Sequence, residues 1–309
     1  KLFALMLALA MCLSLVACGG SSSDSGDAAE DTATEEGAKV VKIGVYEPQT
    51  GDNGAGGKQE ILGIEYAHSL FPTVEIGGET YDVQLEIVDN RTTPENGKSA
   101  AAELMNRGVS VVLGSYGSGV SIAGGEVFKE AGVPAIGVTC TNPQVTADCD
   151  VYFRICFLDP FQGTVLAKFA VEHLKAATVY CLAEEGDNYS AGLCSYFIQA
   201  FTALGGTIVY ETYPAGTTDF APYIRAAQHA EADIFFAPVS IESAMWIIAQ
   251  AETANLGMPI LAGDTWDSNV VAAAGSNAKQ DIYVTTFFDE NVQDEDGKAF
   301  VSGFQQYIS

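Results

Sequence analysis

Residues 109–121 read VSVVLGSYGSGVS, an apolar run that ends in a turn rich in glycine and serine. The short apolar run predicts a buried strand, and the pattern after the turn predicts the start of a helix. The same succession recurs along the chain, with further strands expected at 40–46, 83–88, 135–138, 177–182, 207–213, 234–237, 260–262 and 282–285. Nearly continuous apolar strands that alternate with helices indicate parallel sheets covered on both faces.

A break at Leu158-Asp159-Pro160 lies midway through this succession. We therefore expect an α/β protein with two doubly wound parallel-sheet lobes, the first at 39–158 and the second at 159–286. In such folds ligands bind beyond the carboxyl ends of the strands, where loops lead into helices. The strand-to-helix loops are the segments in which a site is expected.

The stretch LFALMLALAMCLSLVAC at 2–18 is uncharged and mostly apolar. It is shorter than the about 20 apolar residues of a membrane-spanning helix, but it has the length of the apolar region of an export signal. Its ending, Leu15-Val16-Ala17-Cys18, resembles a bacterial lipobox, which predicts a signal peptide at 1–17 and lipidation of Cys18. The alternative is an ordinary signal peptide in which Cys18 is incidental.

The segment at 18–38 is built from small residues and acids and has no basic residue. Such a composition cannot bury enough apolar surface to fold, and charge repulsion extends it. We expect a disordered acidic stalk, so that the protein sits on the extracellular or periplasmic face of the cell membrane and touches it through the lipid anchor only. Because the chain begins with Lys1 and not Met, its natural N-terminus is expected upstream.

The formal net charge of the chain is −26 at pH 7, from 14 Lys and Arg against 40 Asp and Glu. A field of this sign repels nucleic acid and anionic lipid headgroups, and no basic cluster offsets it. The composition therefore excludes nucleic acid as a partner.

The sequence does not decide whether its cysteines form disulfides. Five cysteines follow the stalk: Cys140, Cys149, Cys156, Cys181 and Cys194. An exported protein can form disulfides, and Cys140 with Cys149 would close a short loop, but the number is odd. Buried free thiols are the alternative. No CxxC spacing occurs, which argues against a metal framework.

Little in the sequence supports a metal site, a nucleotide-binding site or a hydrolytic active site. His68, His173 and His229 are scattered and lack a ligand partner at helical spacing. The glycine-rich loop at 50–59 departs from a phosphate loop, because Asp52 stands at its first Gly and Gln59 at its hydroxyl position. No Ser/His/Asp arrangement is visible. We expect no metal, no cofactor and no enzymatic activity.

The loop at 114–121 is the best candidate for an anion site. Its amides, its hydroxyls and the positive end of the following helix dipole converge there, which suits a carboxylate. Tyr116 and Ser118 are the candidate residues of this loop, and Thr139 and Thr141 end the next strand within reach of the same crevice. The alternative is a Gly/Ser turn with a capping serine.

The loop at 263–268 offers a complementary cation site in the other half of the chain. Asp264 and Trp266 place an acid and an indole at the end of a strand, where they could meet an ammonium group through charge and cation–π contact. The alternative is helix capping by Asp267 and a tryptophan buried in the core.

From about residue 41 to 309 these loops, taken in order, resemble the type I periplasmic binding-protein family, in its branched-chain amino-acid (Leu/Ile/Val) branch. The motifs that carry the resemblance are Lys42-Ile43-Gly44-Val45, Thr50-Gly51, the strand at 111–114 with the Ser118 loop, Ala131-Gly132-Val133-Pro134, Thr141-Asn142-Pro143, Phe153-Arg154, Phe161-Gln162-Gly163, Asp187-Asn188-Tyr189, Asp219-Phe220 and Tyr283-Val284-Thr285. No single motif is specific, but their order and spacing together are.

The resemblance implies a role for each candidate. In that family a serine and a threonine hold the carboxylate of an amino acid, matching Ser118 and Thr141, and the residue two before the threonine, here Thr139, contributes backbone contacts. An acid that matches Asp264 holds the ammonium group, and an aromatic that matches Tyr189 packs over the ligand. A zwitterion with both charges paired is buried without the penalty of an isolated ion.

The chain departs from the family at the side-chain pocket. Gly56 falls where an aromatic wall is common, and Val239 or Ser240 falls at a second position that is often aromatic. Trp266 is a candidate to compensate. These departures make an amino acid a safer prediction than leucine.

The resemblance implies an extracellular lipoprotein that binds a branched-chain or other apolar amino acid for an ABC importer, acts as a monomer and contacts the permease. Hinges are expected near Pro160 and at 285–288. A third crossing is missing, which implies a C-terminally truncated chain with an incomplete return into lobe one at 287–309. The alternatives are a non-amino-acid solute (amide, urea or small peptide), a sensory binding subunit, and a surface-anchored α/β hydrolase.

Overall fold

The computed structural model describes residues 39–289, 291 and 294–309. The predicted signal peptide, the lipidated Cys18 and the stalk lie outside the described residues. Within the described part of the chain, no helix has both the length and the apolar character needed to cross a membrane.

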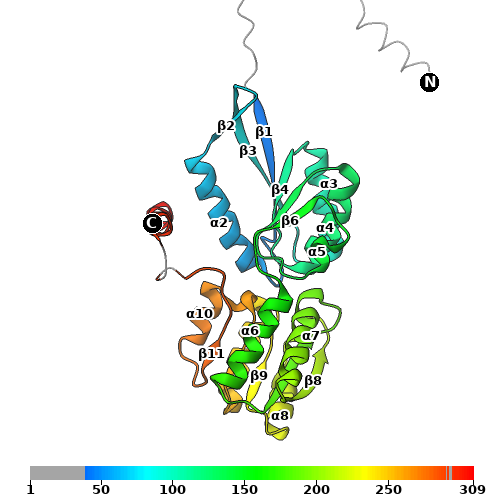
Figure 1. The fold of residues 1–309 in the computed structure, drawn as a ribbon, viewed down its shortest axis with the longest axis vertical. Coiled ribbons are helices and arrows are strands. Elements are labelled where there is room, and N and C mark those ends of the chain that lie inside the picture. The colour runs from blue at the N-terminus through cyan, green and yellow to red at the C-terminus, as the bar shows by residue number, and fades with distance from the viewer. Residues whose placement is uncertain (1–38, 290, 292–293) are drawn as a thin grey trace, which may run out of the picture. The chain divides into compact units, whose positions relative to one another are not determined.

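Residues 39–309 form two lobes, each built on its own sheet (Figure 1). The first sheet has the strand order β2-β3-β1-β4-β5-β6, in which β1 pairs in parallel with both β3 and β4. Its strands are β1 (Val40–Glu47), β2 (Thr73–Ile76), β3 (Glu79–Asp89), β4 (Val111–Leu113), β5 (Ala135–Gly137) and β6 (Tyr152–Arg154). The helices of this lobe are α2 (Gly54–Leu70), α3 (Pro94–Asn106), α4 (Ser118–Ala131) and α5 (Gln144–Ala147).

The second sheet has the order β11-β10-β9-β7-β8, and all of its strand pairs are parallel. Its strands are β7 (Thr178–Glu184), β8 (Thr207–Tyr213), β9 (Ile234–Phe236), β10 (Ile260–Leu261) and β11 (Ile282–Tyr283). Its helices are α6 (Asp159–Glu172), α7 (Asn188–Ala203), α8 (Ala221–His229), α9 (Ile241–Ala254), the 3₁₀ turn η1 (Asp264–Trp266) and α10 (Asn269–Gly275). The last helix, α11 (Glu295–Tyr307), contacts α2 of the first lobe through aromatic rings, among them Phe304 against Tyr66 at a centroid distance of 5.5 Å.

The predicted α/β fold with two parallel-sheet lobes is confirmed, and every predicted strand is present with its ends shifted by a few residues. The structure adds β2 and β6, which were not predicted. β2 is antiparallel to β3, so the first sheet is mixed and not wholly parallel. Gly77 and Gly78 join the two strands with positive φ values of 63° and 85°, as a two-residue hairpin turn requires. β6 reads Tyr152-Phe153-Arg154, so it lacks the aliphatic residues that marked the predicted strands and it ends in a charge.

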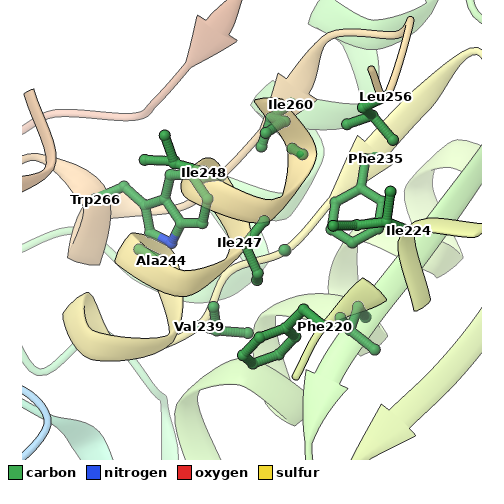
Figure 2. Packing of buried hydrophobic residues seen from close by; sticks show 14 of the residues in the cluster. Phe220, Ile224, Phe235, Val239, Ala244, Ile247, Ile248, Leu256, Ile260 and Trp266 are labelled. Atoms are coloured by element: carbon green, nitrogen blue, oxygen red, sulfur yellow. The ribbon is translucent and has the colours of Figure 1, made fainter. Parts of the chain in front are cut away.

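Both faces of the second sheet are buried, which explains why its strands are apolar without interruption. Phe235 of β9 faces one hydrophobic cluster, whereas its neighbours Ile234 and Phe236 face another, as the two-residue period of a strand requires. In the first cluster Phe235, Ile260 and residues of α9 surround a common core (Figure 2). The lobe therefore has two cores, one on each side of its sheet.

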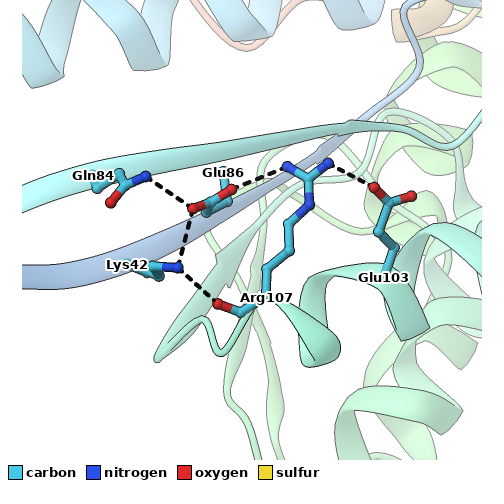
Figure 3. Close-up of polar contacts among 5 residues, drawn as sticks. All are labelled: Lys42, Gln84, Glu86, Glu103 and Arg107. Carbon is cyan, nitrogen blue, oxygen red and sulfur yellow. Dashed lines mark hydrogen bonds and ion pairs between the residues drawn. The ribbon is translucent and has the colours of Figure 1, made fainter. Parts of the chain in front are cut away.

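An ion-pair network at the surface of the first lobe joins β1, β3 and the residue that ends α3. Arg107 donates to Glu86 at 3.0 Å and to Glu103 at 2.6 Å, and Lys42 lies 3.4 Å from Glu86 (Figure 3). Lys42 also donates to the carbonyl of Arg107 at 3.0 Å. Pairs as exposed as these contribute little stability, so we assign the network no larger role.

The five cysteines at 140–194 are free thiols in the structure. Cys140, Cys181 and Cys194 are buried, and Cys149 is half-buried with its thiol 3.4 Å from the carbonyl oxygen of Gly125. The thiols therefore match the alternative of buried, unpaired cysteines.

Candidate ligand-binding site

A cavity of about 400 Å³ lies between the two lobes. Loops that follow β1, β3, β4 and β5 line it from the first lobe, and loops that follow β7, β8, β9 and β10 line it from the second. It therefore sits beyond the carboxyl ends of both sets of strands, where an open α/β sheet binds its ligands. Five of the predicted site residues line this cavity: Tyr116, Ser118, Thr139, Tyr189 and Asp264.

Ser118 opens α4 at the wall of the first lobe. Its hydroxyl oxygen accepts a hydrogen bond from the backbone N–H of Asn142 at 3.2 Å, which leaves its O–H free to donate. Gly119 and Val120 follow it along the cavity, and backbone N–H groups in the first turn of a helix have no carbonyl partner within that helix. With the helix dipole, these donors favour an anionic group such as a carboxylate.

The two predicted threonines differ in whether they reach the cavity. Thr139 lines the cavity, and its hydroxyl donates to the carboxylate of Glu60. Thr141 is fully buried and is not among the lining residues. Its hydroxyl makes no hydrogen bond with the described residues, while its carbonyl accepts from the N–H of Asp159 at 3.1 Å. The structure therefore brings Thr139, but not Thr141, to the cavity beside Ser118.

Asp264 faces the cavity from the second lobe, as the first residue of η1. Its Oδ1 accepts hydrogen bonds from Tyr189 Oη at 2.7 Å and from Gln162 Nε2 at 2.8 Å. Its backbone N–H donates to Gln162 Oε1 at 3.0 Å. Both side-chain bonds fall on Oδ1, so Oδ2 is the oxygen left for a cationic ligand group. Burial raises the pKa of Asp264 to about 6.

Gln162 is a site residue to which the sequence assigned no role. It lies on α6, is 1% exposed, and also accepts a hydrogen bond from Thr285. In the sequence, Gln162 stands out only as part of the Phe161-Gln162-Gly163 motif. A glutamine in an amphipathic helix normally faces solvent, so the burial of Gln162 could not be expected.

A pair of buried carboxyl groups lies behind the first-lobe wall. Glu47 ends β1, is fully buried, and accepts a hydrogen bond from the N–H of Tyr116 at 2.7 Å. Burial is the largest cause that raises its pKa, followed by the neighbouring Glu60, whose own pKa burial also raises. Two carboxyl groups so close cannot both ionise cheaply. The pair has no signature in the sequence, because Glu47 and Glu60 lie on different elements and the helix of Glu60 also carries exposed residues.

Trp266 is not brought to the cavity. Its indole is 2% exposed and packs in the hydrophobic core of the second lobe near Ala244 and Ile248 (Figure 2). Trp266 is therefore a core tryptophan, which was the alternative to a ligand-binding role. Among the positions of the side-chain pocket, Val239 is buried and Ser240 lines the cavity.

The histidines do not supply a catalytic or metal site within the described residues. His68 Nε2 lies 2.9 Å from the carbonyl oxygen of Val83, and His173 stacks on Phe169. No histidine lines the cavity beside Ser118. In the part of the chain that the structure describes, no group of His, Cys, Asp or Glu is arranged to hold a metal ion.

The unfolding free energy of the protein without ligand is expected to fall as the pH rises from about 4 to about 7. Burial raises the pKa of Asp159 to about 7 and that of Asp264 to about 6, whereas Asp in an unfolded chain titrates near about 3.9. The folded state thus holds these protons more tightly. Their contribution is complete below about pH 4 and is lost as the pH passes the folded pKa values.

Asp159→Asn removes one of these ionisations, so its melting temperature relative to the unmodified protein should rise steadily between pH 4 and pH 8. The difference should reach the equivalent of about 4 kcal/mol. Asp148→Asn, at an exposed position, serves as the control and should give a difference that changes little with pH. A difference for Asp159→Asn that stays constant with pH would contradict the argument.

Comparison with known proteins agrees with this geometry. The family described as periplasmic binding protein matches residues 40–309. Leu/Ile/Val-binding protein homolog 1 of Brucella abortus (strain 2308) is 28% identical over 268 residues, which cover 86% of this chain and 71% of the relative.

Two solved structures are similar over most of the chain. The leucine-binding protein LivK of Thermotoga maritima MSB8 has a TM-score of 0.82 and 31% identity, and the match covers 86% of this chain and 76% of LivK. The branched-chain amino-acid transporter substrate-binding protein LivJ of Streptococcus pneumoniae, in complex with isoleucine, has a TM-score of 0.79 and 26% identity, with 87% and 77% covered. With two sheet lobes around one cavity and a family match over residues 40–309, this chain belongs to the periplasmic binding protein family.

Proposed function

We propose that this protein is the extracellular substrate-binding component of an ABC importer and that it binds an amino acid between its lobes. The observation that carries the proposal is one cavity with opposite chemistry on its two walls. Ser118 and the start of α4 offer hydrogen-bond donors on one side, and Asp264 offers a carboxylate oxygen on the other. An amino acid presents a carboxylate and an ammonium group to match them.

The zwitterion explains why such charges can be buried together. Transfer of an isolated ion from water to a protein interior is costly, but the cost is offset when each charge meets a partner and its hydrogen bonds are satisfied. An ammonium group at Asp264 would also favour the ionised carboxylate and return its pKa toward the usual range. Binding should therefore be accompanied by proton release near pH 6.

The wider role rests on family membership and on the N-terminal sequence. We assign Cys18 as the lipid attachment site, the extracellular or periplasmic face as the location, and the permease of the importer as the partner of a monomeric binding protein. A sensory binding subunit would use the same cavity but would act through a signalling partner. Transport assays with the cognate permease separate these two roles.

The rest of the cavity wall favours a second candidate for the ligand side chain. A branched-chain amino acid, as in the LivJ complex, needs an apolar pocket, but Val120 and Ala215 are the lining residues with aliphatic side chains, apart from Pro94. Several acids line the cavity instead, among them Glu184 and Asp187. Burial, and then the charge of Asp187, raises the pKa of Glu184 to about 7. Such a wall favours a polar or cationic side chain.

A thermal-shift panel of the twenty amino acids tests the proposal and ranks the candidates. Ligand at 100 times its Kd should add about 2.7 kcal/mol to the unfolding free energy, which corresponds to a shift of roughly 5–10 °C for a chain of this size. Shifts with Leu, Ile and Val would support the apolar class, and shifts with Lys and Arg the cationic class. If none of the twenty shifts the melting temperature, the amino-acid proposal is wrong and amides, urea and small peptides become the candidates.

A further inference from the structure

Tyr116 belongs to the first lobe, but its side chain also packs against the hydrophobic core of the second. It lies in the loop between β4 and α4, is 7% exposed, and is part of the same buried cluster as Val239, Ile248 and Trp266 of the second lobe. No ligand contact is needed to explain this burial, because the ring already has a protein environment on the far side of the cleft.

The hydroxyl of Tyr116 makes a specific bond across the cleft. Oη donates to the backbone carbonyl of Thr265 at 3.0 Å, between residues 149 positions apart. Thr265 directly follows Asp264, and its own hydroxyl donates to the carbonyl of Val239 at 2.8 Å. The tyrosine thus holds the backbone that carries the acid of the second-lobe wall. At its other end, the N–H of Tyr116 is bound to Glu47 at the end of β1.

Gly56 makes room for the ring. A Cβ atom built on Gly56 would lie 2.6 Å from Cε2 and Cζ of Tyr116, closer than real Cβ contacts allow. Gly56 is in the first turn of α2, where a side chain would otherwise be favoured. Gly56 and Tyr116 therefore form one arrangement, in which the absence of a side chain at position 56 leaves room for the ring that comes from the loop between β4 and α4.

We propose that Tyr116 is a cross-lobe latch, a positioning residue that holds Asp264 opposite Ser118 in the closed cleft. This inference rests on the proposed function for its link to ligand binding, but the contact itself joins protein atoms only. Other bonds also cross the cleft, namely the N–H of Ile241 to Asn53 Oδ1 at 3.0 Å, the N–H of Glu242 to the carbonyl of Asp52 at 3.1 Å and the amide of Asn188 to Gln144 Oε1 at 3.4 Å, among others. Tyr116 differs because it also buries a ring.

The latch bond can form only when the lobes are closed, so its loss shifts the population toward the open state. Removing one buried hydroxyl that leaves a carbonyl unpaired changes an equilibrium by about tenfold. A ligand leaves only from the open state, so its dissociation rate should rise by the same factor. This holds for any closed fraction of the free protein.

The test is Tyr116→Phe in the full chain, with Tyr152→Phe as the matched control. Tyr152 Oη also donates from a buried ring to a backbone carbonyl, that of Gly114 at 2.6 Å, but within the first lobe. Small-angle X-ray scattering without ligand should show a larger radius of gyration for Tyr116→Phe and an unchanged one for Tyr152→Phe. Stopped-flow dissociation of the amino acid that gives the largest thermal shift should be about tenfold faster only for Tyr116→Phe.

A double-mutant cycle tests the partnership with Gly56. Gly56→Ala should displace the ring and open the protein as Tyr116→Phe does, whereas Gly56→Ala added to Tyr116→Ala should have little further effect. Equal scattering of Tyr116→Phe and the unmodified protein together with equal dissociation rates, or the same opening in Tyr152→Phe, would overturn the latch. Failure of every amino acid to bind the unmodified protein would instead overturn the proposed function and leave the scattering result to decide the latch.

Discussion

Asp264→Asn is expected to weaken amino-acid binding by at least about 30-fold without lowering the melting temperature of the free protein. Under the proposed function, the substitution removes the carboxylate assigned to the ligand ammonium group, and breaking a buried charge pair on one side costs about 2–5 kcal/mol. The amide oxygen can still accept the bonds from Tyr189 and Gln162, so the fold keeps its contacts. Isothermal titration calorimetry with the amino acid that gives the largest thermal shift measures the loss.

The matched control is Asp267→Asn, three residues later. Asp267 is exposed, does not line the cavity, and accepts a hydrogen bond from Thr286 at 2.6 Å. Its substitution should change the affinity by less than about threefold, because the charge is screened by solvent. An Asp264→Asn protein that binds the amino acid as tightly as the unmodified protein would remove Asp264 from the site.

Arg154→Gln is expected to lower the free energy of unfolding by about 3 kcal/mol, or roughly 6–12 °C in melting temperature. Arg154 ends β6 and binds four acceptors with one guanidinium group, the carbonyls of Cys140, Asn142 and Pro143 and the hydroxyl of Thr146. The shorter amide cannot reach all four, and the carbonyl groups that lose their donor are partly buried. Differential scanning calorimetry measures the change.

Arg154→Gln should also weaken ligand binding, because the segment it holds supports Ser118. The N–H of Asn142 donates to Ser118 Oγ, and the Asn142 amide donates to the carbonyl of Asn188 at 2.7 Å on the second lobe. Arg225→Gln, at an exposed position on α8, is the control and should leave both quantities nearly unchanged. Equal melting temperatures for Arg154→Gln and the unmodified protein would show that water replaces these bonds without cost.

The sequence alone determined the architecture and one side chain on each wall of the cavity. Apolar strands that alternate with helices predicted the two lobes because strand and helix periodicity is a local property of the chain. The ends of such strands meet at one edge of a sheet, so Ser118 and Asp264 could be assigned from their positions after β4 and β10. The hairpin through Gly77 and Gly78 is equally local, because two adjacent glycines between short apolar runs are typical of such a turn.

Only the tertiary structure decided which side chains meet. Trp266 and Asp264 are two residues apart at the end of the same strand, yet one enters the core and the other faces the cavity. Gln162 reaches Asp264 across 102 positions, and Tyr116 reaches Thr265 across 149. The buried pair Glu47 and Glu60 likewise joins a strand end to a helix. A local pattern specifies the element that carries a side chain, but the partner of that side chain depends on how distant elements pack, and packing has no signature within a short window of sequence.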